Sequence, residues 1–180
     1  MNLANRLTLI RIAAIPVFIV CFYIPSVYRY LIAATVFILA YITDIFDGRY
    51  ARKHNLVTDF GKLMDPIADK LLTSSALVFL TAENMVSPIC TFIIIAREFI
   101  ISAMRLIALE KGKVIAASGL GKIKTVSQCV AISAVLISPS ILPWITVPAA
   151  VILTWAAAGL TLWSGLDYII KNTGLFKDGR

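Results

Sequence analysis

The fold is decided by residues 30–53, which read YLIAATVFILAYITDIFDGRYARK. The first half of this stretch is apolar, whereas the second half carries Asp44 and Asp47. A second acidic pair, Asp65 and Asp69, stands at the edge of the next apolar stretch. Carboxylates at the edge of an apolar segment are costly to bury, so they indicate that the acids have a partner or a function.

The composition predicts a helical membrane protein. Of the 180 residues, 59% are hydrophobic and 15% are charged, and the mean hydropathy is +0.88. This balance is typical of a polytopic membrane protein and unlike that of a soluble domain. Because no polar stretch is long enough to form a separate soluble unit, we expect one all-α membrane domain over residues 1–180.

Six apolar segments predict six transmembrane helices. They are residues 9–23, 30–45, 67–80, 87–108, 126–137 and 144–170. Several are shorter than the ~20 residues that a span needs. Segments two and three continue into polar stretches, 44–53 and 62–70, which we expect to be helical and to line a cavity at the membrane edge. Pro66 fits the first turn of the third helix.

The basic residues predict the orientation of the chain. Net charge is +7, and Lys and Arg gather at both termini and in the second and fourth loops. The positive-inside rule then places both termini and these two loops in the cytoplasm, with only Arg29 opposing the assignment. We expect these cations to face anionic lipid, because no basic helix or groove for nucleic acid is present.

The four aspartates favour a site for divalent cations. Asp44 and Asp47 share one helix face, as do Asp65 and Asp69, and the second loop joins their two helices as antiparallel neighbours. Four converging carboxylates repel one another unless cations neutralise them. Ligation by oxygen alone favours Mg²⁺ or Mn²⁺ over zinc. We interpret the single histidine, His54, as an exposed loop residue.

Small residues and an arginine accompany the acids, and each has two interpretations. Gly48, Gly61 and Ala51 either let helices pack closely or leave room for a ligand beside the metals. Arg52 is either a cytoplasmic anchor or a clamp for a phosphate.

The full string resembles the signature of the CDP-alcohol phosphatidyltransferase family. It reads Asp44-x2-Asp47-Gly48-x2-Ala51-Arg52-x8-Gly61-x3-Asp65-x3-Asp69, and every fixed position is filled. Four further stretches resemble the bacterial branch of that family that uses sn-glycerol 3-phosphate; they are residues 8–16, 95–105, 121–125 and 160–164.

The resemblance implies a fold, a reaction and a set of site residues. It implies a homodimer of six-helix chains in the bacterial cytoplasmic membrane, with the site facing the cytoplasm. The phosphatidyl group would pass from CDP-diacylglycerol to sn-glycerol 3-phosphate, releasing CMP. Asp44, Asp47 and Asp65 would hold two cations, and Asp69 would both contact metal and act as general base. The CDP pocket would be lined by Asp47, Gly48, Ala51, Arg52 and Gly61.

The acceptor carries a phosphate, and four cations are candidates to bind it. Arg97 and Arg105 are eight residues apart, within about a quarter turn around a helix. The other two candidates, Lys122 and Lys124, lie in the fourth loop and at the start of segment five. Each could instead be a cytoplasmic anchor, although Arg97 lies deep in an apolar run beside Glu98.

The remaining assignments concern the loops and the N-terminus. We interpret Gly119 and Gly121 as a flexible loop able to close over substrate. Asn5 and Thr8 either contact the nucleotide or cap the first helix.

Two alternatives to glycerol 3-phosphate transfer stay open. The core motif concerns only the CDP end, so the acceptor could be inositol phosphate, serine or another phosphatidyl group, although the basic cluster favours a phosphorylated one. A divalent-cation transporter is the alternative from another class. Ion pathways need polar groups across the whole membrane depth, whereas these acids cluster at one end.

Overall fold

The computed structural model describes residues 3–53, 59–110, 119–141 and 143–173, with side chains for 9–43, 67–110, 119–141 and 147–173. These residues form six α-helices, one short 3₁₀ helix and no strand. The elements are α1 (Leu3–Cys21), α2 (Arg29–Lys53), α3 (Asp59–Ala82), α4 (Pro88–Glu110), α5 (Gly119–Ile137), η1 (Ser138–Ser140) and α6 (Pro143–Lys171).

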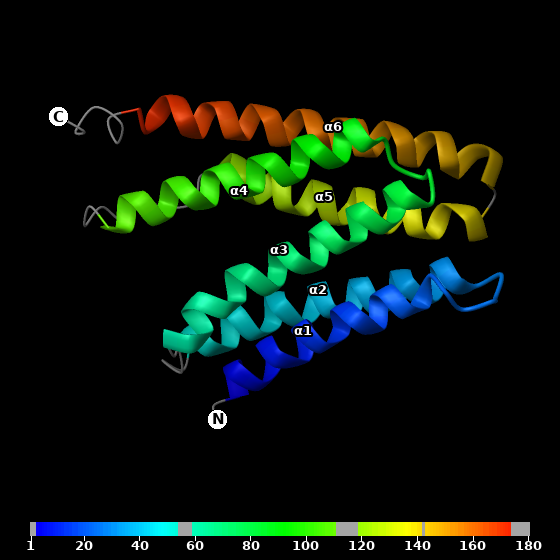
Figure 1. Ribbon diagram of the computed structural model, residues 1–180, viewed down its shortest axis with the longest axis horizontal. Helices are drawn as coiled ribbons and strands as arrows, with labels where there is room; N and C mark the ends of the chain where they lie inside the picture. Colours follow the sequence, from blue (N-terminus) through cyan, green and yellow to red (C-terminus); the bar gives the residue numbers. More distant parts are fainter. Residues whose placement is uncertain (1–2, 54–58, 111–118, 142, 174–180) are drawn as a thin grey trace.

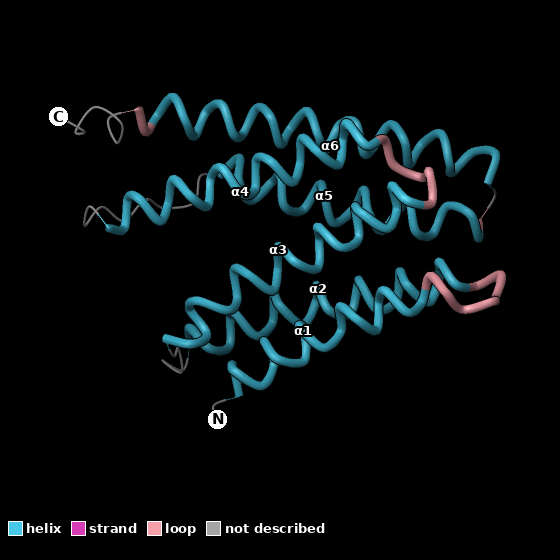
Figure 2. Tube along the Cα trace, viewed as in Figure 1, coloured by secondary structure: helices cyan, strands magenta, loops and turns pink. Residues whose placement is uncertain are grey.

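The helices run up and down in alternation, so that consecutive helices are antiparallel (Figure 1). The start of α1, the end of α6 and the α2–α3 and α4–α5 junctions all lie at one end of the bundle, on the left of Figure 1. We call this the junction end. The α1–α2, α3–α4 and α5–α6 connections lie at the other end, where the described loops are short (Figure 2). The described helix ends that border the basic stretches of the sequence therefore share one end of the molecule.

Every predicted apolar segment coincides with one helix, and the two polar extensions are helical as predicted. Two details were wrong. α3 begins at Asp59, so Pro66 lies beyond its first turn; a proline removes one backbone donor but does not prevent helix on both sides. α5 begins at Gly119, so Gly119 and Gly121 start a helix instead of forming a loop. There the Thr125 hydroxyl donates to the Gly121 carbonyl at 3.0 Å.

Apolar side chains from all six helices form one core. Phe18 of α1 lies against Phe37 of α2, with ring centroids 6.1 Å apart, and both side chains are fully buried. Leu72 and Leu77 of α3 and Ile132 of α5 complete the centre of this cluster. Buried alanines in α2, α3 and α6 let the helix backbones approach closely.

The connection between α3 and α4 is held by an ion pair. Asn84 takes a left-handed backbone conformation, with φ 59°, and the amide of Met85 donates to the Leu80 carbonyl at 2.9 Å, which caps α3. Glu83 beside this turn accepts from Arg29 Nη2 at 2.9 Å and from the Tyr30 hydroxyl at 2.7 Å. Arg29, the cation that opposed the charge rule, is therefore neutralised by a carboxylate.

The outer surface of the described bundle is strongly apolar. Two stretches, Gly119–Ser140 and Val147–Lys171, are long and apolar enough to cross a membrane, and two shorter apolar helical stretches are Leu9–Cys21 and Arg29–Thr43. Exposed apolar side chains follow the whole length of α6; they include Val151, Ile152, Trp155, Leu162, Trp163, Leu166 and Ile170. A surface of this kind is unsuited to water and suited to lipid or to another protein.

We expect Phe37→Ala to destabilise the protein much more than Leu39→Ala. Phe37 is fully buried, so its truncation leaves a cavity that costs about 3 kcal/mol. Leu39 lies on the same helix but is 59% exposed, so its side chain has little packing to lose. Thermal unfolding of the two variants in the same detergent measures the difference, and equal losses would contradict the assignment of the core.

Candidate functional site

The aspartates predicted to hold metal lie in α2 and α3. Asp44 and Asp47 are one turn apart in α2, and Asp65 and Asp69 are one turn apart in α3. The two helices contact each other and meet at the junction end (Figure 1). The side chain of Asp69 is described, whereas those of the other three lie outside the described side chains.

The donor chemistry fits a hard divalent cation. Two antiparallel helices each present a pair of carboxylates at helical spacing, and carboxylate oxygens are the ligands that Mg²⁺ and Mn²⁺ prefer. Within the described side chains alone, no group of three His, Cys, Asp or Glu residues comes together. A metal site of the kind predicted from the sequence would draw on Asp44, Asp47 and Asp65, whose side chains lie outside the described ones, as well as on Asp69.

The residues predicted to line the CDP pocket also have helical backbones but lie outside the described side chains. Asn5 and Thr8 belong to α1, Gly48, Ala51 and Arg52 to α2, and Gly61 to α3. For each of these residues, the ligand-binding interpretation and the structural interpretation therefore both stay open.

A buried ionic cluster joins α4, α5 and α6. Lys124 of α5 is only 4% exposed, and its ammonium forms an ion pair with Glu98 of α4. Arg97 Nη1 lies 3.6 Å from the same Glu98 oxygen, and its Nη2 donates to the Ser164 hydroxyl of α6 at 2.9 Å. Since Glu98 is shared between two cations, this cluster keeps an excess of positive charge.

Arg105, another predicted acceptor residue, extends the cluster along α4 and α6. Its Nε donates to the Tyr168 hydroxyl at 3.4 Å, and its guanidinium carbon lies 5.5 Å from the centre of the Tyr168 ring. Arg105 also interacts electrostatically with Arg97. The structure thus brings Arg97, Arg105 and Lys124 together.

The structure does not bring Lys122 into the same group. Lys122 is exposed, and two residues along a helix place it about 200° around α5 from Lys124. Its position suits a surface cation at the junction end better than a member of a buried cluster.

Asp69 and its neighbour Lys70 connect the aspartates to the basic cluster. Asp69 lies within electrostatic range of Lys124, and half-buried Lys70 interacts electrostatically with Glu98, Arg105 and Arg97. Lys70 was not predicted to be a site residue. Its position directly after Asp69, where the apolar part of α3 begins, could have indicated that it belongs to the site. Arg11 was predicted to be a terminal charge, whereas it is buried, with 3% exposure.

A polar contact beside the cluster fixes α5 against α6. The Gln128 amide donates to the Thr161 hydroxyl at 2.9 Å, and that hydroxyl donates to the Ala157 carbonyl at 2.6 Å. Gln128 lies one turn after Lys124, and Thr161 lies one turn before Gly165. This contact sets how closely the helices that carry the cluster approach each other.

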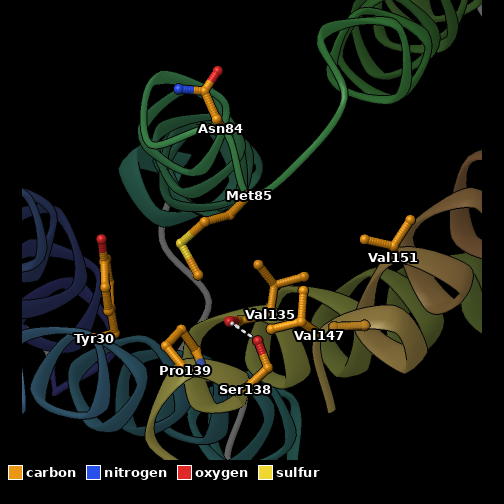
Figure 3. Close-up of a pocket in the computed structure, with 9 residues that line it drawn as sticks. Tyr30, Asn84, Met85, Val135, Ser138, Pro139, Val147 and Val151 are labelled. Atoms are coloured by element: carbon orange, nitrogen blue, oxygen red, sulfur yellow. Dashed lines mark hydrogen bonds between the residues drawn. The ribbon is translucent and has the colours of Figure 1, made fainter. Parts of the chain in front are cut away.

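A cavity of about 300 Å³ lies elsewhere, at the end with the short loops (Figure 3). Tyr30, Met85, Pro139 and Val147 are among the side chains around it. The hydroxyl of Ser138 there is engaged with the Val135 carbonyl, at 2.8 Å. This cavity holds none of the predicted site residues and is far along the bundle from the junction end.

The arrangement suits the recognition of a phosphate close to a carboxylate-rich centre. Buried arginine and lysine side chains bind phosphate oxygens strongly, because water does not compete with them and guanidinium offers paired donors. Asp69 and Lys70 are neighbours in α3, and both lie within electrostatic range of this cationic group.

Comparisons with known proteins identify the family of the chain. A model of the CDP-alcohol phosphatidyltransferase family matches residues 1–163. Proteins named CDP-diacylglycerol–glycerol-3-phosphate 3-phosphatidyltransferase are similar to the chain. The protein from Bacillus subtilis is 41% identical, covering 95% of each chain, that from Rickettsia bellii is 45% identical over 93% of each, and that from Salmonella paratyphi A is 42% identical over 96% of each. The chain therefore belongs to the CDP-alcohol phosphatidyltransferase family.

Proposed function

We propose that this protein transfers the phosphatidyl group of CDP-diacylglycerol to sn-glycerol 3-phosphate, giving phosphatidylglycerophosphate and CMP. The observation that carries the choice of acceptor is the cluster around Glu98, in which the cations Lys70, Arg97, Arg105 and Lys124 outnumber the carboxylates Glu98 and Asp69. An uncharged alcohol would leave the positive charge of this cluster unneutralised, whereas the phosphate of a phosphate ester neutralises it. The names of the relatives support the same acceptor.

The setting that we propose is the bacterial cytoplasmic membrane. All six helices cross it as one domain, with both termini and the active site facing the cytoplasm, and two chains form a homodimer. The apolar outer surface of α6 and the gathering of basic stretches at the junction end support this orientation. The charges inside α4 do not oppose a span, because Arg97 and Glu98 face other helices instead of lipid.

Asp44, Asp47, Asp65 and Asp69 would hold Mg²⁺ or Mn²⁺, two ions in our proposal. Such cations supply neutralisation of the negative charge on the pyrophosphate of CDP-diacylglycerol. The CDP portion would lie along Asp47, Gly48, Ala51, Arg52 and Gly61, with Asn5 and Thr8 of α1 nearby.

The residues of the chain then perform binding, orientation and proton transfer. Arg97, Arg105 and Lys124 bind the phosphate of glycerol 3-phosphate, and Lys70 adds positive charge between that phosphate and Asp69. Lys122 would attract the acceptor from the surface. Asp69 accepts the proton of the C1 hydroxyl as its oxygen bonds to the β-phosphorus, and the bond from that phosphorus to CMP breaks in line. Fixing two substrates in one geometry contributes much of the rate.

An acceptor panel tests the proposed function. Purified protein with labelled CDP-diacylglycerol and Mg²⁺ should release CMP with glycerol 3-phosphate, and much more slowly with serine or glycerol. Inositol phosphate is the informative competitor, because it would also satisfy the cationic cluster. Faster release with inositol phosphate would reassign the acceptor, and metal flux into liposomes without any CMP release would revive the transporter alternative.

We expect Asp69→Asn to lower the transfer rate by about 10²- to 10⁴-fold, because the amide cannot accept the proton of the acceptor hydroxyl. Asp167→Asn is the matched control. Asp167 lies on α6 in an ion pair with Lys171, with oxygen and nitrogen 2.8 Å apart, and contacts no proposed site residue in the described structure. CMP release measures both variants; equal activities would remove Asp69 from the role of base.

Removal of divalent cations should abolish transfer. EDTA strips the cations that the four carboxylates hold, and the resulting repulsion opposes binding of the anionic pyrophosphate. Added Mg²⁺ or Mn²⁺ should restore CMP release, while Zn²⁺ should not, because the site offers oxygen ligands alone. EDTA already saturated with Mg²⁺ is the control, and full activity in free EDTA would contradict a metal requirement.

A further inference from the structure

The position of Arg97 depends on two neighbouring residues of α6. The described side chain of Arg97 is 10% exposed, and it leaves α4 to lie across the surface of α6. Its Nη2 donates to the Ser164 hydroxyl at 2.9 Å. The stem of the same side chain passes over Gly165, the next residue of α6.

Gly165 supplies space that no other residue could supply. A Cβ atom at this position would lie 2.9 Å from Cγ of Arg97, 3.6 Å from its Nε and 3.9 Å from its Cδ. The shortest of these distances is below normal van der Waals contact, so any side chain there would push Arg97 out of its present path. The glycine at this position therefore determines where the guanidinium lies.

Ser164 holds the guanidinium without neutralising it. The hydroxyl accepts a hydrogen bond from Arg97 and carries no charge, and the carboxylate of Glu98, 3.6 Å from Arg97 Nη1, is shared with Lys124. The Nε of Arg97 is buried and has no hydrogen-bond partner among the described residues. A guanidinium has five N–H donors, so several remain available to an anion.

Arg29 shows the contrasting arrangement at the other end of the bundle. There a carboxylate, Glu83, binds the guanidinium directly at 2.9 Å, and the Tyr30 hydroxyl binds the same carboxylate. Such a pair is complete in itself and holds two segments together. Arg97 instead shares its carboxylate with Lys124, and its Nε has no hydrogen-bond partner among the described residues.

We propose that Ser164 and Gly165 are positioning residues that orient Arg97 toward the phosphate of the acceptor and thereby set the affinity for that substrate. This inference rests on the proposed function only in taking the acceptor to be a phosphate ester. The two residues act through Arg97 and do not touch the reacting atoms. They govern binding of the acceptor phosphate and leave binding of the CDP end unchanged.

Gly165→Ala and Ser164→Ala test the proposal, with Gly159→Ala as the matched control. Gly159 lies on the same helix, and a Cβ there would meet nothing within 4 Å. Each test variant should raise KM for glycerol 3-phosphate about tenfold, the effect of weakening one phosphate contact. KM for CDP-diacylglycerol and the unfolding temperature should stay at the wild-type values. Ser164→Thr, which keeps the hydroxyl, should retain most of the wild-type affinity for the acceptor.

Binding of inorganic phosphate, measured by titration calorimetry on the purified protein with Mg²⁺, separates this proposal from the proposed function. If Gly165→Ala binds phosphate more weakly than Gly159→Ala does, the result supports the positioning of Arg97 by Gly165, even if glycerol 3-phosphate is not the acceptor. Unchanged KM and unchanged phosphate binding in both test variants would overturn it. A matched rise in KM for both substrates would also overturn it, because that result indicates a purely structural role.

Discussion

The carboxylate of Glu98 is the constraint on which the rest of the site depends. It is shared by a buried lysine from α5 and an arginine from its own helix, so it joins α4 to α5 in a part of the bundle where apolar packing alone would exclude charge. Removing one partner from a buried pair of this kind leaves an uncompensated charge, which costs several kcal/mol. The cluster therefore holds α4 and α5 in a fixed relation, and that relation carries the remaining cations to their positions.

The two ends of the bundle use similar residues for different purposes. At the end with the short loops, Arg29, Glu83 and Tyr30 satisfy one another, and the backbone turn at Asn84 is capped. At the junction end, the cations outnumber the carboxylate that holds them. A bundle of apolar helices thus carries one polar group around Glu83, whose members satisfy one another, and one around Glu98, which we propose to bind the acceptor.

Most of the helical arrangement could be predicted from the sequence, because apolar segments and basic loops are local signals. The start of α5 could not, since Gly119, Gly121 and the lysines resemble a loop in composition, although the stretch is helical. Contacts between helices could not be predicted either, because no local sequence pattern indicates that Glu98 pairs with Lys124 or Arg97 with Ser164. Gly165 gave no signal at all, because a glycine that makes room for a distant side chain looks like any small residue of a membrane helix.

The one-sided distribution of cations has a consequence for the membrane itself. In the proposed orientation, the enzyme would meet its water-soluble acceptor from the side of the membrane that the basic helix ends face. The new anionic lipid would then enter the leaflet on that side, and the other leaflet would receive it only by transbilayer movement. An asymmetric distribution of the lipid between the two leaflets would then arise from the orientation of the enzyme itself, before any lipid transporter acts.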